Sequence, residues 1–132
     1  MDNTKDSTRA KVKANAGVNA GGKASDGDGD FVFAYITAGS PEEARRIGRA
    51  LVQERLAACA NILDGMTSIY HWQGGLEEAT ESVLIAKTRA ALFEPLAARV
   101  RELHSYDVPC IVELKVGRGN PAYFDWLREG TA

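Results

Sequence analysis

Strand-like and helix-like segments alternate in a fixed order along the larger, C-terminal part of this chain, and this order restricts the fold more than any other feature. The run Phe31–Ile36 is apolar, β-branched and aromatic, which is typical of a buried strand. Ser40, Pro41 and Glu43 then form a capping box, which marks the start of a helix. Apolar residues repeat at helical spacing from there, so the helix is predicted to end near Arg55.

A long hairpin is predicted next. Leu56–Ile62 and Thr67–Trp72 have the composition of one strand, interrupted by a break or bulge at Asp64-Gly65. Gly74-Gly75 is a hairpin turn signal, and Leu76–Thr88 is the returning strand. The hairpin is long for a chain of this size and carries exposed apolar and aromatic side chains, so we expect it to pack against another subunit.

The remaining segments complete the pattern. A second amphipathic helix is predicted after Arg89, with an apolar stripe that ends at Leu103, and Ile111–Val116 alternates as a fourth strand. Asn120-Pro121 opens a short terminal helix. The order β-α-β-β-α-β predicts an α+β, ferredoxin-like sandwich with two helices on one face of an antiparallel sheet and one extra C-terminal helix.

The first 30 residues differ in composition from the rest. They contain no aromatic residue, and five basic residues balance five aspartates. Such a segment cannot bury enough apolar area to offset the entropy lost on ordering, so residues 1–30 are predicted to be a disordered tail. Residues 31–132 are predicted to be a single folded domain.

Charge and cysteine content exclude several classes of protein. Residues 31–132 contain 11 basic and 13 acidic side chains without a basic stripe, which argues against a nucleic-acid partner. No apolar run approaches the roughly 20 residues that span a bilayer, and no secretory signal is evident, so no membrane partner is expected. Cys59 and Cys110 are far apart and unpatterned, which favours a reducing, cytoplasmic compartment.

The connector His104–Pro109 carries the densest chemistry in the chain. It places an imidazole, a phenol and a carboxylate, those of His104, Tyr106 and Asp107, within four residues. Pro109 lacks an N–H and holds the residue before it extended. The connector is therefore predicted to be a metal site, the lip of a ligand cleft, or a polar junction at which His104 hydrogen-bonds at a helix C-terminus.

Four motifs, taken in their order and spacing, resemble a known family. They are RLAACAN at 55–61, TSIYHWQG at 67–74, IAKT at 85–88 and HSYDVP at 104–109, with NPAYFDW at 120–126 fitting the C-terminus. Together they resemble the CutA divalent-cation-tolerance family from Phe31 to about Leu127. The resemblance implies a tight homotrimer similar to PII signalling proteins, clefts between subunits, and a link to tolerance of copper and other divalent metals, with no established enzymatic activity.

The resemblance also assigns roles to single residues, and it is incomplete. Cys59 and His104 match a cysteine and a histidine of the family. Some copper-binding members also have a cysteine in the first strand and a second adjacent histidine, and these positions hold Ile36 and Leu103 here. Cys110 is close enough in sequence to His104 to compensate for a lost ligand.

Two candidate sites follow. A metal site for Cu²⁺ or another divalent ion would use His104, Cys59 and Cys110, although both thiols are also typical of small buried residues. A ligand cleft would use a second set of side chains, in which Lys87 could bind an anion or be a solvated edge residue and Trp72 could be a packing residue. This second set is Lys87, Tyr106, Asp107, Glu113 and Trp72.

The sequence thus predicts a non-enzymatic homotrimer that binds a metal ion of the copper class between subunits, in the response to metal ions. A PII-like sensor of a small anionic ligand, and a trimeric interaction module, are the alternatives. A thiol enzyme based on Cys59 and His104 lacks an orienting third group or an oxyanion hole in the sequence.

Overall fold

The structure is a computed structural model that describes residues 29–132. The predicted tail therefore lies outside the described residues, except for its last two. Four strands and three α-helices, with a 3₁₀ turn, follow one another along the described part of the chain. Their bounds are β1 Phe31–Ala38, α2 Pro41–Gln53, β2 Cys59–Trp72, β3 Gly75–Arg89, η2 Ala90–Leu92, α3 Phe93–Leu103, β4 Ile111–Lys115 and α4 Pro121–Gly130.

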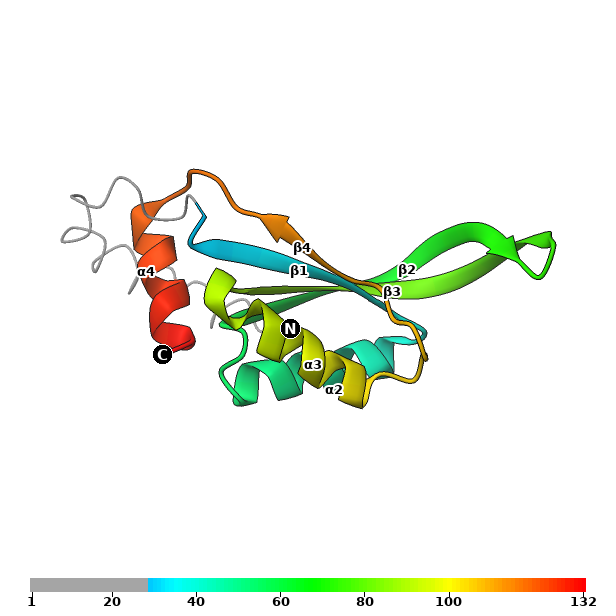
Figure 1. Cartoon of the computed structure of the whole chain (residues 1–132), viewed down its shortest axis with the longest axis horizontal. Coiled ribbons are helices and arrows are strands. Elements are labelled where there is room, and N and C mark those ends of the chain that lie inside the picture. Colours follow the sequence, from blue (N-terminus) through cyan, green and yellow to red (C-terminus); the bar gives the residue numbers. More distant parts are fainter. Residues whose placement is uncertain (1–28) are drawn as a thin grey trace.

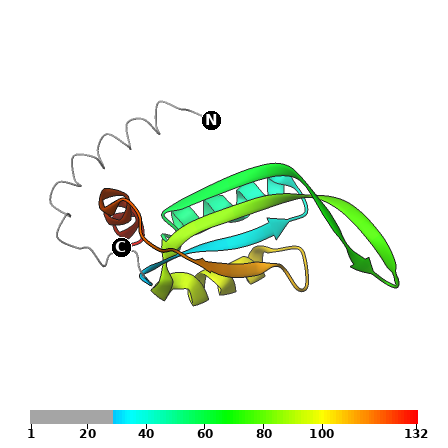
Figure 2. The ribbon, with the colours of Figure 1, turned by 90° about the horizontal axis from the view of Figure 1, so that it is seen from above.

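The four strands form one antiparallel sheet in the order β2-β3-β1-β4. Helices α2 and α3 lie side by side on one face of it, and α4 lies at one end (Figures 1 and 2). This order and this single helix layer confirm the predicted ferredoxin-like α+β sandwich with an added C-terminal helix.

Helix α2 begins as its capping box predicts. The Ser40 hydroxyl accepts a hydrogen bond from the Glu43 N–H at 3.1 Å, and Pro41 occupies the first turn. The helix ends at Gln53, and the N–H groups of Leu56 and Ala57 both bond to the Leu51 carbonyl. Because these bonds close the helix end, β2 begins at Cys59 and not at Leu56.

The β2–β3 hairpin extends well beyond the two-layer body (Figure 1). Its register shifts between Leu63 and Met66, where Gly65 adopts a φ of 77°, so the predicted interruption is a bulge. The tight turn is Gln73-Gly74, with φ values of 50° and 84°. It lies one residue earlier than predicted, because Gln73 accepts the left-handed conformation that was assigned to a glycine.

The main core lies between the sheet and the helix layer. Ile36, Leu84, Leu51 and Val100 are fully buried in it. On the opposite face, α4 covers one end of the sheet, where the Phe124 ring stacks on Phe31 with 5.0 Å between centroids.

The rest of that opposite face is open. Val112 and Leu114 of β4 are 51% and 47% exposed, and Leu63 of β2 is 62% exposed. Among residues 29–132, no helix is both long and apolar enough to cross a membrane.

Candidate functional site

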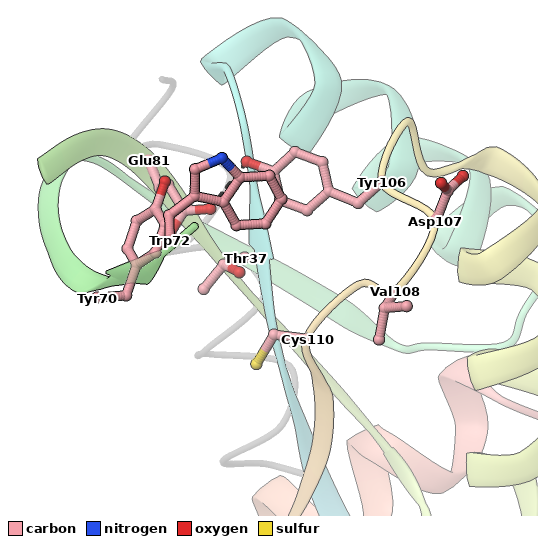
Figure 3. Close-up of a pocket in the computed structure, with 8 residues that line it drawn as sticks. All are labelled: Thr37, Tyr70, Trp72, Glu81, Tyr106, Asp107, Val108 and Cys110. Carbon is pink, nitrogen blue, oxygen red and sulfur yellow. Dashed lines mark hydrogen bonds between the residues drawn. The ribbon is translucent and has the colours of Figure 1, made fainter. Parts of the chain in front are cut away.

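A pocket of about 670 Å³ lies where the hairpin leaves the body of the molecule. The connector between α3 and β4 forms one side of it and the hairpin the other (Figure 3). Figure 3 shows the rings of Tyr70, Trp72 and Tyr106 gathered around Glu81, with Cys110 on the connector side. The lining residues are Thr37, Tyr70, Trp72, Glu81, Tyr106, Asp107, Val108 and Cys110.

Strand geometry explains why the hairpin residues meet there. Side chains alternate between the two faces of a strand, so Tyr70 and Trp72 share one face of β2. Tyr70 pairs with Glu77 and Met66 pairs with Glu81, so Glu81 shares that face on β3. The face is continuous with the open side of the sheet, and the pocket therefore opens away from the helix layer.

A buried histidine holds the connector in place. The His104 side chain is 0% exposed, and its Nε2 lies 2.7 Å from the Thr37 carbonyl oxygen. Because a carbonyl only accepts, Nε2 carries the proton. Nδ1 accepts the Tyr106 N–H at 3.0 Å, so it is unprotonated. Both ring nitrogens of His104 are thus engaged with backbone, which fixes where Tyr106 lies.

Glu43 completes this anchor. Its carboxylate accepts the N–H of Gly39 at 3.2 Å and that of Ser105 at 2.7 Å, and lies 3.6 Å from Nδ1 of His104. Burial raises the pKa of Glu43, but the hydrogen bonds from Ser105 and Gly39 outweigh it, so the net pKa is lowered. The capping-box pattern identified Glu43 as a helix cap, and its bond to the connector 62 residues away left no signal in the sequence.

Tyr106 links the connector to the hairpin. Its hydroxyl donates to Oε2 of Glu81 at 2.9 Å, and the Ser68 hydroxyl donates to Oε1 at 2.7 Å. Burial, the bond to Glu81 and the charges of Glu81 and Glu43 raise the pKa of Tyr106 to about 12. A Cβ on Gly39 would lie 3.1 Å from the Tyr106 hydroxyl, so a glycine here leaves room for the phenol.

The three predicted metal ligands do not come together within one subunit. Cys110 lines the pocket and is exposed. The His104 ring is buried, does not line the pocket, and has both nitrogens bonded to backbone groups. Cys59 pairs with Lys87, and Lys87 pairs with Phe33 of β1. Phe33 is four residues along β1 from Thr37, the residue that His104 contacts, and four residues of strand correspond to about 13 Å. No group of three His, Cys, Asp or Glu side chains suited to a metal occurs among residues 29–132.

Only some of the predicted ligand-cleft residues lie at the pocket. Trp72, Tyr106 and Asp107 line the pocket. Lys87 lies elsewhere on the open face, where its amine is 3.3 Å from the Tyr123 hydroxyl and 5.2 Å from the centre of the Phe33 ring.

Glu113 is on the other side of the sheet. In the register of β1, Ala34 pairs with Glu113 and Phe33 pairs with Lys87, so Glu113 and Lys87 project from opposite faces. Glu113 and Lys87 therefore do not belong to one cleft. Glu81, Tyr70, Thr37 and Val108 were not predicted as site residues, although the alternation along the hairpin places Glu81 on the same face as Tyr70.

The sheet order, the single helix layer and the long hairpin with a pocket at its base define a class: small ferredoxin-like α+β proteins with an extended hairpin. The profile of the family described as "CutA1 divalent ion tolerance protein" matches residues 32–130. This chain belongs to that family.

Individual relatives agree. The divalent-cation tolerance protein CutA of Thermus thermophilus is 54% identical over 96 residues, which span 73% of this chain and 93% of that protein. The chloroplastic protein CutA of Arabidopsis thaliana is 39% identical over 100 residues, which span 76% of this chain and 55% of the plant protein. The chain therefore spans nearly all of the bacterial relative but about half of the plant one.

Solved structures show the same fold. The divalent cation tolerance protein from Thermus thermophilus superimposes with a TM-score of 0.74 at 51% identity, covering 77% of this chain and 99% of that one. The periplasmic divalent cation tolerance protein CutA from Archaeoglobus fulgidus gives a TM-score of 0.75 at 41% identity, again covering 77% and 99%.

Proposed function

We propose that this protein acts in divalent-cation tolerance as a homotrimer, and that it binds a metal ion of the copper class in clefts between its subunits. The observation that carries the proposal is the pocket at the base of the hairpin, which places Cys110, Glu81 and Asp107 around one opening. Thiolate, and to a lesser degree carboxylate, are ligands that divalent transition metals accept.

The exposed apolar surface supports the trimer. Ile69 and Leu76 on the hairpin are 64% and 71% exposed. Val112 and Leu114 add apolar surface on the open sheet face, and exposed apolar surface of this extent is typical of a subunit interface. Two such surfaces, the hairpin and the sheet face, suit a closed ring in which each subunit contacts two others.

A neighbouring subunit is required to complete a metal site. In one subunit, the donors around the pocket do not form a set of three among residues 29–132. Cys110 is the predicted ligand placed to take part, whereas His104 would have to give up its bond to Thr37 or to Tyr106. Cys59 would take part only in a separate site, because it lies at the other end of the sheet.

Lys87 does not favour the alternative of an anion sensor at this pocket. Its amine contacts the Tyr123 hydroxyl and two aromatic rings, away from the pocket. The remaining alternative, an interaction module whose trimer is its main property, differs from the metal proposal in having no stoichiometric metal affinity. We also propose that the protein is not an enzyme. We further propose that it is cytoplasmic, because two free cysteines far apart in the sequence are typical of a reducing compartment.

Two measurements test the proposal. Sedimentation equilibrium should give three times the 14.2 kDa chain mass, and a monomer or dimer would contradict the trimer. A competitive copper titration should show binding that Cys110→Ser weakens and Cys59→Ser does not. Full affinity in the triple variant of Cys59, His104 and Cys110 would contradict the metal site. Binding should weaken as pH falls, because a thiol ligand must be deprotonated.

A further inference from the structure

The pocket at the base of the hairpin combines aromatic rings with negative charge. Three rings, those of Tyr70, Trp72 and Tyr106, line it together with the carboxylate of Glu81. Asp107 adds a second carboxylate on the connector side, and no lysine or arginine is among the lining residues that the structure describes. The pocket therefore disfavours an anion.

The charge of Glu81 is held in place but not neutralised. Both of its oxygens accept hydrogen bonds from neutral hydroxyls, those of Ser68 and Tyr106. Within residues 29–132, none of the ion pairs of the structure joins Glu81 to a basic side chain. The raised pKa of Tyr106, caused first by burial and then by Glu81, agrees with a negative field in the pocket.

We propose that this pocket binds a small organic cation of the ammonium class, with the Tyr70, Trp72 and Tyr106 rings facing the alkyl groups and Glu81 balancing the charge. Aromatic faces attract ammonium groups through their quadrupole, and a nearby carboxylate adds to that attraction. A volume of about 670 Å³ is within the range of small-molecule sites. The ammonium site shares its pocket with the metal proposal, but it is built on the rings and Glu81 and does not depend on Cys110.

Tetramethylammonium chloride is a suitable probe, and the two tryptophans provide a residue-specific signal. In the full chain labelled with ¹⁵N, the indole N–H peak of Trp72 should shift saturably during the titration, at constant ionic strength. The peak of Trp126, which lies on α4 outside this pocket, should not move. Trp72→Phe assigns the peaks. Tert-butanol, a neutral molecule of similar size, should leave both peaks in place.

Charge at Glu81 should decide the affinity. Glu81→Gln keeps the size of the side chain and should weaken binding about tenfold, which corresponds to about 1.4 kcal/mol. Glu78→Gln is the matched control, since Glu78 is exposed on the same strand but projects from the opposite face. Tyr70→Leu, which keeps apolar bulk but removes a ring, should weaken binding several-fold and gives a second test should Glu81→Gln not fold.

Three results would overturn the inference: no saturable shift of Trp72, an equal shift with tert-butanol, or unchanged affinity in both Glu81→Gln and Tyr70→Leu. Cys110→Ser separates the two proposals, because it removes the thiol of the proposed metal site and leaves the three rings and Glu81 in place. It should weaken copper binding and leave tetramethylammonium binding unchanged. Either proposal can therefore fail without the other.

Discussion

Replacing Glu43 with alanine tests the claim that a buried carboxylate fixes the connector of the pocket. Glu43 is only 8% exposed, and its two oxygens accept the N–H groups of Gly39 and Ser105. Alanine removes both acceptors and leaves two backbone donors, from segments on either side of the carboxylate, without a partner. It also removes the carboxylate that lies 3.6 Å from His104.

The expected loss follows from these two bonds. A hydrogen bond to a charged group contributes about 1.5 kcal/mol or more, so the pair contributes about 3 kcal/mol to the free energy of unfolding. With a urea m-value of about 1–3 kcal/mol/M, the unfolding midpoint should fall by about 1–3 M. Ser105 and Tyr106 should also exchange their amide hydrogens faster, because the connector loses its anchor.

Urea unfolding at one fixed subunit concentration measures this loss, since the stability of an oligomer depends on concentration. Glu42→Ala is the matched control, because Glu42 is an exposed neighbour in the same helix turn. It should cost about 0.5 kcal/mol through the helix dipole alone. If Glu43→Ala cost no more than Glu42→Ala, the anchoring role of Glu43 would be wrong.

Three further predictions concern pH, the bulge and the phenol. The pKa of Glu43 in the folded protein lies below 4.5, so the stabilisation that its carboxylate contributes is present above about pH 4.5 and is lost as pH falls through that pKa. Below pH 4.5, the urea midpoint of Glu43→Gln should therefore decline less than that of the wild type. Gly65→Ala should lower the free energy of unfolding by about 1 kcal/mol, because Gly65 has a φ of 77°, whereas Gly75→Ala should be near neutral. Equal losses in the two variants would refute backbone strain at Gly65. Tyr106→Phe should cost about 1 kcal/mol in urea, and no cost would mean that the bond to Glu81 is negligible.

The fold was predictable because its signals are local. The capping box at Ser40, the alternation of apolar residues and the interruption at Asp64-Gly65 each act within a few residues, and together they specify the order of elements. The turn was displaced by one residue because Gln73, and not only glycine, adopts a positive φ. That choice depends on the pairing of the whole hairpin and not on the local sequence.

The site was only partly predictable because it is built from long-range register. Tyr106 meets Glu81 across 25 residues, and Ser105 meets Glu43 across 62. No local pattern specifies these contacts. The connector was correctly singled out as chemically dense, but its histidine faces inward onto Thr37, so Tyr106 and not His104 reaches the pocket.

The most direct test of the proposed metal site is an anomalous difference map, collected at the copper edge, from crystals of the full chain grown with copper. We predict one copper peak per subunit at the base of the hairpin, beside Cys110 and in contact with a second subunit. A peak beside Cys59, or no ordered copper from a protein that binds it stoichiometrically in solution, would contradict the proposed site.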